Sequence, residues 1–306
     1  MEIEIKLLLP PQQAPQRLND WQWPVALTDV AELRLGNRYF DTPDQALRQQ
    51  DMGLRIRRHG EQRELTLKTA GQVQGGVHAR PEYNLPIDSD KPDLHRFPDG
   101  LFSDVQLQTW PSQLEAIFAT DFVRQRALLQ QGDLQLEVAL DYGHVVAHGQ
   151  QAPIAELELE LIHGEVAALM PLVAALMHQQ PLRLGLDSKA ARGYRLAGIQ
   201  APAAVQQQWS ADASGILQAW QRNEERLLAG EGTALPPLVR VWQQTLPWLA
   251  PELAAWLQAS MAALGAPALS MVDVRSTMLD CLAQPQYGLA QLQLLAQSLR
   301  QAKTLP

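Results

Sequence analysis

The sequence predicts an α+β fold, with a β-barrel and surrounding helices over residues 1–200 and an all-helical bundle over residues 203–306. In the first part, polar and apolar residues alternate with the period of two that is typical of strands. The second part is rich in Ala, Leu and Gln, and its apolar residues recur at helical spacing. The polar positions of the expected strands are nearly all charged, which is unusual for a sheet face that only meets water.

The composition narrows the classes of protein to consider. The chain has 306 residues, of which 46% are hydrophobic, and this is enough for two domains with cores of their own. Its net charge of −8 gives no reason to predict a nucleic-acid partner. Cys281 is the one cysteine, and no apolar run reaches the roughly 18 residues that span a membrane. We therefore expect a soluble, cytoplasmic protein with no signal peptide and no membrane contact.

Each expected strand carries its charges on one face, because successive strand side chains point to opposite faces. In the first strand, Glu2, Glu4 and Lys6 share a face and alternate with apolar residues. The equivalent polar positions on later strands are Arg55 and Arg57; Glu64, Thr66 and Lys68; Arg80 and Glu82; Arg124 and Arg126; Glu137 and Asp141; and Glu156, Glu158 and Glu160. Basic residues thus gather on the middle strands and acidic residues on the first and last strands.

A closed barrel would turn this charged face inward, with helices covering its apolar outer face. A dry interior with so many charges would be very costly, so such a barrel would hold a charged ligand. Arg and Lys side chains would bind an anion, and carboxylates would bind Mg²⁺ or Mn²⁺. A metal-bound polyphosphate needs both. The alternative is a sandwich with a charged exterior, and the separation of acidic from basic strands weighs against it.

Helices are expected in both parts of the chain. In the first part, residues 11–21 and 165–178 are amphipathic, and a further helix is expected within residues 101–119. The second part holds five of the eight tryptophans and no histidine. Gly and Pro residues interrupt it at residues 230–232, 236–237, 251, 265–267 and 285. These breaks predict four or five short helices, packed as a bundle.

Six segments, in order along the chain, resemble those of a known family. They are EIEIK at residues 2–6, YFDT at 39–42, LRIR at 54–57, LK at 67–68, ELELE at 156–160 and SKAARGY at 188–194. Together they resemble the CYTH superfamily, the triphosphate tunnel metalloenzymes, over about residues 1–200. The resemblance implies an antiparallel eight-stranded β-barrel that forms a tunnel. The segment 203–306 resembles the start of a CHAD domain, at residues 220–225 and 238–240, and is short enough to be a partial one.

The resemblance, taken with the chemistry of the side chains, assigns roles by position. It implies a catalytic role for Glu2, Glu4, Lys6 and Glu158. The metal ligands for Mg²⁺ or Mn²⁺ would be Glu2, Glu4, Asp141, Glu156 and Glu158. The substrate's phosphates would be bound by Lys6, Arg55, Arg57, Lys68, Arg80, Arg124, Arg126, Lys189 and Arg192. Which carboxylate orients the attacking water is left open.

The activity implied is metal-dependent hydrolysis of inorganic triphosphate to pyrophosphate and phosphate within the tunnel. Two alternatives come from the same superfamily: a class IV adenylate cyclase, and a thiamine or nucleoside triphosphatase. A third alternative, of another class, is a polyphosphate-binding module without catalysis. The expected partner is inorganic triphosphate or another polyphosphate, with no nucleic acid and no membrane, and the oligomeric state is left open.

Overall fold

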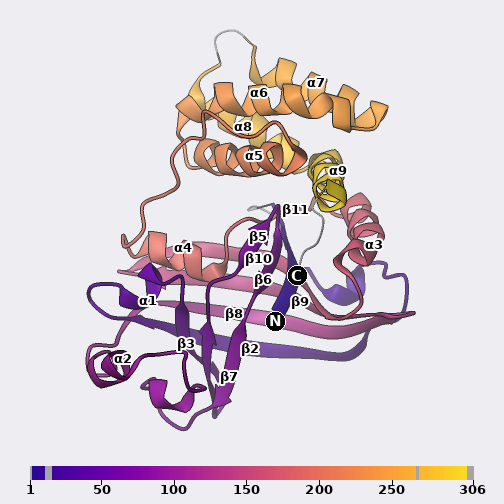
Figure 1. Ribbon diagram of the computed structural model, residues 1–306. Coiled ribbons are helices and arrows are strands. Elements are labelled where there is room, and N and C mark those ends of the chain that lie inside the picture. Colours follow the sequence, from indigo (N-terminus) through magenta and orange to yellow (C-terminus); the bar gives the residue numbers. More distant parts are fainter. Residues whose placement is uncertain (1, 11–15, 267–268, 302–306) are drawn as a thin grey trace.

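The computed structural model describes residues 2–10, 16–266 and 269–301, and shows a curled antiparallel sheet beside a layer of helices (Figure 1). The strands are β1 (Glu2–Leu8), β2 (Thr28–Asp41), β3 (Gly53–His59), β4 (Gln62–Lys68), β5 (Gln72–Gln74), β6 (Val77–Arg80), β7 (Glu82–Pro86), β8 (Glu115–Gln131), β9 (Leu134–Ala147), β10 (Gln150–His163) and β11 (Arg183–Leu184). Their order in the sheet is β5-β6-β1-β10-β9-β8-β2-β3-β4-β7, and β11 pairs with β1. The fold class is therefore α+β, as predicted.

The two ends of this sheet are joined by one continuous stretch of chain. Strand β6 pairs with β1, strand β7 pairs with β4, and only Pro81 separates β6 from β7. The carbonyl of Pro81 also accepts a hydrogen bond from the amide of Thr69, at 3.1 Å. When β6 and β7 are counted as one bent strand, the main circuit has the eight strands that were expected. Strands β5 and β11 are additions at its margin.

Strand register places the charged residues on the inner face of this circuit. Glu4 lies opposite Glu160, and Glu160 lies opposite Glu137, across β1, β10 and β9. On the other side of the circuit, Asn37 of β2 lies opposite Arg57 of β3. Residues directly opposite in neighbouring strands share a face, so one face can be followed around the whole circuit. The predicted charged face is thus the inside of the barrel.

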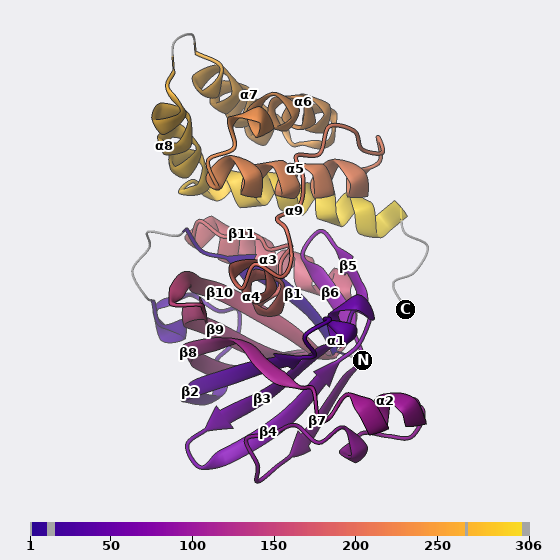
Figure 2. The same cartoon turned by 90° about the vertical axis from the view of Figure 1, so that its left-hand side faces the viewer.

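The outer face of the barrel is apolar and is covered by helices and loops. The helices are α1 (Ala46–Gln49), α2 (Asp104–Thr109), α3 (Val166–Gln179), α4 (Lys189–Leu196), α5 (Ala213–Leu228), α6 (Leu235–Thr245), α7 (Pro251–Leu264), α8 (Met271–Leu282) and α9 (Pro285–Gln301). Short 3₁₀ helices are η1 (Leu18–Asp20), η2 (Leu94–Arg96), η3 (Gly232–Ala234) and η4 (Leu246–Trp248). In both views α9 lies between the other C-terminal helices and α3 (Figures 1 and 2).

One of the predicted helices differs from the structure. Residues 11–15 of the expected helix 11–21 lie outside the described residues, and the rest contains only the 3₁₀ helix η1. The helix expected within 101–119 is present as α2, and residues from Glu115 onward join β8. Helix α3 agrees with the helix expected at 165–178.

Within the described residues, none of the helices has both the length and the apolar character that a membrane span requires.

The C-terminal helices share a core with the barrel. Leu7 of β1 and Leu157 of β10 belong to the same buried apolar cluster as Trp220 of α5 and Leu295 of α9. The tip of the β5–β6 hairpin also enters this region, since a Cβ on Gly75 would lie 2.4 Å from the side chain of Leu217. The division near residue 200 stays a prediction. The structure does have a stretch without helix or strand between α4 and α5, at residues 197–212.

Candidate active site

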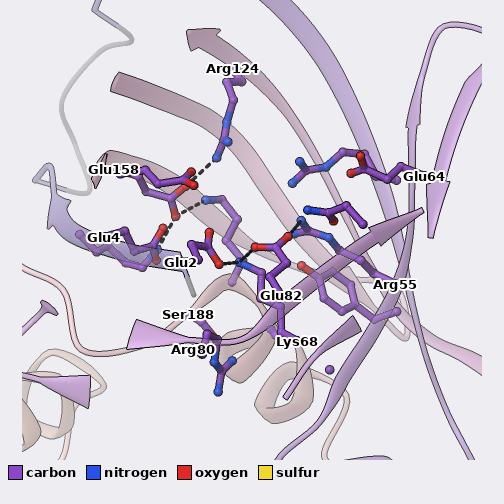
Figure 3. A pocket seen from close by; sticks show the side chains of 18 of the residues that line it. Glu2, Glu4, Arg55, Glu64, Lys68, Arg80, Glu82, Arg124, Glu158 and Ser188 are labelled. Atoms are coloured by element: carbon purple, nitrogen blue, oxygen red, sulfur yellow. Dashed lines mark hydrogen bonds and ion pairs between the residues drawn. The ribbon is translucent and has the colours of Figure 1, made fainter. Parts of the chain in front are cut away.

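The barrel encloses a cavity of about 250 Å³, which we call the tunnel cavity. Most of its lining is charged, and its side chains come from strands all around the circuit (Figure 3). The lining residues are Glu2, Glu4, Lys6, Tyr39, Gly53, Arg55, Arg57, Glu64, Lys68, Arg80, Glu82, Asn84, Arg124, Glu137, Glu158, Glu160, Ser188, Lys189 and Ala190. Such a lining suits a ligand that carries charges of both signs.

Three buried cations hold a cluster of carboxylates at the base of the cavity. Lys189 Nζ lies 2.7 Å from Asp141 Oδ2, 2.6 Å from Glu156 Oε1 and 2.9 Å from Glu158 Oε1. Lys6 Nζ contacts Glu158 as well, and lies 3.3 Å from Glu156 Oε1. Burial opposes the ionisation of Glu158, but Lys189, Lys6 and Arg124 outweigh it and keep the pKa of this carboxyl well below its usual range.

This cluster brings three carboxylates close together. One oxygen each from Asp141, Glu156 and Glu158 lies within 4.8 Å of the others, a spacing that a metal ion could bridge. However, Asp141 and Glu156 are fully buried, and protein cations already occupy their oxygens. Arg124 binds both oxygens of Asp141, at 2.8 and 2.7 Å. Asp141 and Glu156 therefore lie behind the cavity wall and anchor its cations.

A second group joins β1, β4 and β7 at the wall that closes the barrel. Lys68 Nζ lies 2.6 Å from Glu2 Oε2 and 3.0 Å from Glu82 Oε2, and Arg55 Nη2 lies 3.5 Å from Glu82 Oε1. Burial, and a hydrogen bond between the two carboxyl groups, raise the pKa of Glu2 to about 8. A cation bound beside Glu2 would therefore favour the ionised form of this carboxyl group.

Other carboxylates face the cavity with few cations nearby to balance their negative charge. Among the described residues, no cation lies within 4.0 Å of the Glu160 carboxylate. Burial, together with the neighbouring Glu137 and Glu4, raises the pKa of Glu160 to about 7. Glu4 lies 3.3 Å from Lys6, which it shares with the carboxylates at the base. Glu4 and Glu160, which are paired across β1 and β10, form an acidic patch whose charge is only partly balanced by Lys6.

The opposite wall carries excess positive charge. Arg57 donates from Nε to Asn37 Oδ1 at 3.0 Å, but no carboxylate of the described chain lies within 4.0 Å of its guanidinium group. Burial, and repulsion from Arg55 and Arg124, lower the pKa of Arg57 to about 10. Arg55 is also buried, and its Nε atom has no hydrogen-bond partner within the described structure. This basic patch would be stabilised by an anion.

Helix α4 closes one end of the barrel and sends Lys189 into it. Its N-cap is Ser188, whose hydroxyl accepts a hydrogen bond from the amide of Ala191 at 3.1 Å. Its second turn packs tightly, because a Cβ on Gly193 would lie 2.1 Å from the ring of Phe118. Tyr194 makes an edge contact with the same ring, at 5.2 Å between centroids. This packing fixes the helix, and with it the position of Lys189.

Most of the predicted site residues line the tunnel cavity, and four do not. Asp141 and Glu156 lie behind the wall, as described. Arg126 lies nearer one mouth, where it pairs with Asp29 and Glu137 at 2.8 Å each. Arg192 reaches Glu156, but it lines a different pocket, beside the C-terminal helices. The sequence analysis assigned no role to Tyr39, Glu64, Glu82, Glu160 and Ser188, which also line the cavity. Glu64 and Glu160 lie an even number of residues from Lys68 and Glu158 on their own strands, so they share a face with these residues, and that signal could have identified them.

Fold and site together define a class of antiparallel barrel proteins whose interior is lined by charged side chains of both signs. The chain belongs to the CYTH family: the model of the CYTH domain matches residues 1–194. A curated relative, the inorganic triphosphatase of Haemophilus influenzae, is 40% identical over 202 residues, which are 65% of this chain. The match spans 56% of that relative's length.

Solved structures with similarity to the chain are more distant. One, from Hippeastrum, is described as an adenylyl cyclase candidate with a dominant triphosphatase activity. It is 23% identical, with a TM-score of 0.49, over 66% of this chain and 98% of its own. Another is a hypothetical protein from Pyrococcus furiosus, 14% identical with a TM-score of 0.33, over 65% of this chain and 92% of its own.

Proposed function

We propose that this protein hydrolyses inorganic triphosphate to pyrophosphate and phosphate in the tunnel cavity, with a divalent cation as cofactor. The observation that carries the proposal is the pair of incompletely balanced patches, one acidic and one basic, on opposite walls. Arg57 belongs to β3 and Glu160 to β10, and these strands are four apart in the eight-strand circuit. A ligand that is anionic on one side and cationic on the other, such as a metal-bound triphosphate, would compensate both patches.

The donor chemistry of the lining fits Mg²⁺ or Mn²⁺. The acidic wall offers carboxylate oxygens, which these ions prefer, and the described lining contains neither thiolate nor imidazole. We propose that the ion binds at Glu2, Glu4 and Glu160, and we assign Asp141, Glu156 and Glu158 to the protein's own lysines and arginines. When bound, the cation would polarise phosphoryl oxygens as a Lewis acid.

The chain's own residues then have distinct roles in the reaction. Arg55, Arg57, Lys68 and Arg124 would bind non-bridging oxygens and neutralise the charge that develops on the transferring phosphoryl group. Water attacks the terminal phosphorus, the bond from that phosphorus to the bridging oxygen breaks, and pyrophosphate leaves with the bonding electrons. Lys189 is held by three carboxylates and would keep a fixed position during this step.

The lining favours an inorganic substrate over the organic alternatives. A nucleoside or thiamine group needs apolar or aromatic surface to bind, and Tyr39 is the one aromatic residue in the described lining. The family and the named relative also support triphosphate.

From the composition, we propose the cytoplasm as the compartment, since a chain with one cysteine forms no disulfide within itself.

Phosphate release from inorganic triphosphate, ATP and thiamine triphosphate, with Mg²⁺, Mn²⁺ or a chelator, tests the proposal. We expect fast release from triphosphate, dependent on metal, and much slower release from the other two. Formation of cyclic AMP and pyrophosphate from ATP would instead indicate a cyclase. Tight binding of triphosphate without release would indicate a binding module.

Two variants and a matched control locate the activity in the cavity. Glu4→Gln should abolish metal-dependent turnover, and Arg57→Gln should lower kcat/KM about 100-fold, as expected for the loss of one electrostatic donor. Arg63→Gln is the control, because Arg63 lies on β4 near Arg57 but pairs with Asp90 at 2.7 Å outside the cavity. Equal losses in all three variants would contradict the assignment.

A further inference from the structure

A cavity of about 460 Å³ lies between the barrel and the C-terminal helices, and we call it the α4–α5 cavity. In both views α5 lies above α4, and residues 197–212 run from one helix to the other (Figures 1 and 2). Among the described residues, none lines both this cavity and the tunnel cavity. The α4–α5 cavity is therefore a separate space, which the reaction proposed above does not use.

Most of the lining of this cavity is apolar and is drawn from both parts of the chain. The barrel contributes Leu8 of β1 and Pro153 of β10, α4 contributes Leu196, and α5 contributes Leu228. Ligand cavities in proteins are commonly of this kind, with volumes of roughly 300–1,000 Å³ and a few polar groups that orient the ligand. The polar groups of the α4–α5 cavity therefore decide which ligand it fits.

The arginines in the lining already have carboxylate partners within the protein. The ion pairs are Arg183 with Glu224, Arg192 with Glu156, Arg195 with Asp187, and Arg226 with Glu231. An anionic ligand would have to compete with one of these carboxylates for its arginine. The arginines therefore give the cavity little affinity for an anion.

Glu225 of α5 is the lining carboxyl group that lacks such a partner. It is partly buried, and within the described part of the chain no Arg, Lys or His nitrogen lies within 4.0 Å of its carboxyl oxygens. The charged groups that act on it are Asp187 after β11, Arg195 of α4, and Glu224 and Arg222 of its own helix. Burial, followed by repulsion from Asp187, raises the pKa of Glu225 to about 8, and the attraction of the two arginines does not offset this. A positive group in the cavity would supply the missing counter-charge.

We infer that the α4–α5 cavity is a binding site for a small organic ammonium ion. The charged group of this ligand pairs with the Glu225 carboxylate, and its apolar body packs against the leucine and proline side chains of the lining. An uncharged ligand of the same shape would fill the cavity but leave Glu225 without a counter-charge. The inference does not depend on triphosphate hydrolysis, because the two cavities have separate linings among the described residues.

Calorimetry with the full chain, without metal or triphosphate, tests the inference with three probes that share one apolar body. They are cyclohexylmethylammonium, cyclohexylmethanol and cyclohexanecarboxylate. At about pH 9 Glu225 is mostly ionised, and an alkylammonium group, like that of lysine, keeps its proton. The ammonium ion should bind about tenfold more tightly than the alcohol, the gain expected from one charge-assisted hydrogen bond. The carboxylate should bind most weakly.

Three variants locate the binding site. Glu225→Gln keeps the size of the side chain and removes its charge, so the tenfold preference should disappear while the affinity for the alcohol stays the same. Glu4→Gln is the matched control, because the acidic patch of the tunnel cavity is another place that could attract an ammonium ion, and this variant should keep the preference. Ala229→Trp places a large side chain in the lining at the exposed end of α5, and should weaken the binding of all three probes.

The pH dependence of binding gives a second readout. Below pH 8 Glu225 mostly holds its proton, so the affinity for the ammonium ion should rise about fivefold between pH 7 and pH 9, and the affinity for the alcohol should stay constant. Glu225→Gln should lose this dependence. The inference is overturned if none of the probes binds, if the ammonium ion and the alcohol bind equally, or if the carboxylate binds most tightly. It is also overturned if Glu4→Gln, and not Glu225→Gln, removes the preference.

Discussion

The ion pair between Arg183 and Glu224 offers a quantitative test of how the helical segment is attached to the barrel. Arg183 lies on β11, beside β1, and Glu224 lies on α5. Arg183 Nε and Glu224 Oε1 are 2.6 Å apart, and their side chains are only 10% and 3% exposed. The other oxygen of Glu224 accepts hydrogen bonds from the Tyr287 hydroxyl at 2.6 Å and from Gln291 Nε2 at 3.0 Å. Removal of this carboxylate would leave a buried cation without a counter-charge, since its other contact is with the carbonyl oxygen of Leu9 at 3.4 Å.

The expected cost follows from these contacts. In Glu224→Leu the unpaired Arg183 should lower the free energy of unfolding by about 4 kcal/mol. The double variant, Arg183→Met with Glu224→Leu, removes both charges and should recover at least about 2 kcal/mol of that loss. Urea denaturation followed by tryptophan fluorescence measures both values. Trp220 is a suitable reporter, because its Nε1 donates to the Tyr287 hydroxyl at 2.6 Å.

A matched pair on the same helix is the control for this experiment. Arg226 and Glu231 are also ion-paired, but they lie near the surface, so Arg226→Met should leave the urea midpoint unchanged. If Glu224→Leu costs less than about 1 kcal/mol, or if the two single variants add within about 0.5 kcal/mol, the buried pair does not couple the two parts.

Three further predictions concern packing, capping and pH. Gly193→Ala should lower the free energy of unfolding by about 1–3 kcal/mol, because the added methyl group overlaps the Phe118 ring; a thermal melt with no decrease in Tm would contradict this. Asp41→Ala should cost about 2 kcal/mol in urea denaturation, since its carboxylate accepts three backbone amides at 2.8–3.0 Å; a cost below about 0.5 kcal/mol would remove its structural role. Burial and the nearby Asp187 raise the pKa of Glu225 to about 8, so the folded state holds this proton more tightly than the unfolded state. Its contribution to stability is full below pH 4.5 and is lost as the pH rises through about 8, by up to about 5 kcal/mol. The Glu225→Gln variant cannot ionise at this position, so its urea midpoint should rise relative to that of the wild type between pH 5 and pH 9. Parallel plots of urea midpoint against pH for the two proteins would refute the assignment.

The sequence was sufficient to predict the barrel because its strands alternate so regularly. The period of two placed Glu2, Glu4 and Arg57 on one face, and the structure has that face inside. The same rule extends to Glu82, two residues after Arg80, and to Glu160, two residues after Glu158. The sequence analysis placed these two residues on the charged strand faces but did not assign them to the site. It took the roles from the family's motifs and did not ask which other residues share the same strand face.

Other features depend on packing that no local pattern encodes. Lys189 and Arg192 are three residues apart on α4, yet one lines the tunnel cavity and the other lies beside the C-terminal helices. The difference comes from the contact between Gly193 and Phe118, which joins residues far apart in the chain. In the same way, the role of Asp141 and Glu156 as anchors for Lys189 became visible only when the strands and α4 were in place.

Pro81 and the bent strand around it bear on how this protein folds. The first strand pairs with β10, β6 and β11, and its register with β10 joins Glu4 to Glu160. Contacts between such distant residues form slowly, because a long loop of chain must be ordered before they contribute. Strand β1 can be enclosed only when β10 has folded on one side and the chain around Pro81 has connected β6 with β7 on the other. The tunnel cavity should therefore be among the last parts of the protein to form, and any anion or cation that binds there would stabilise the finished barrel and not its intermediates.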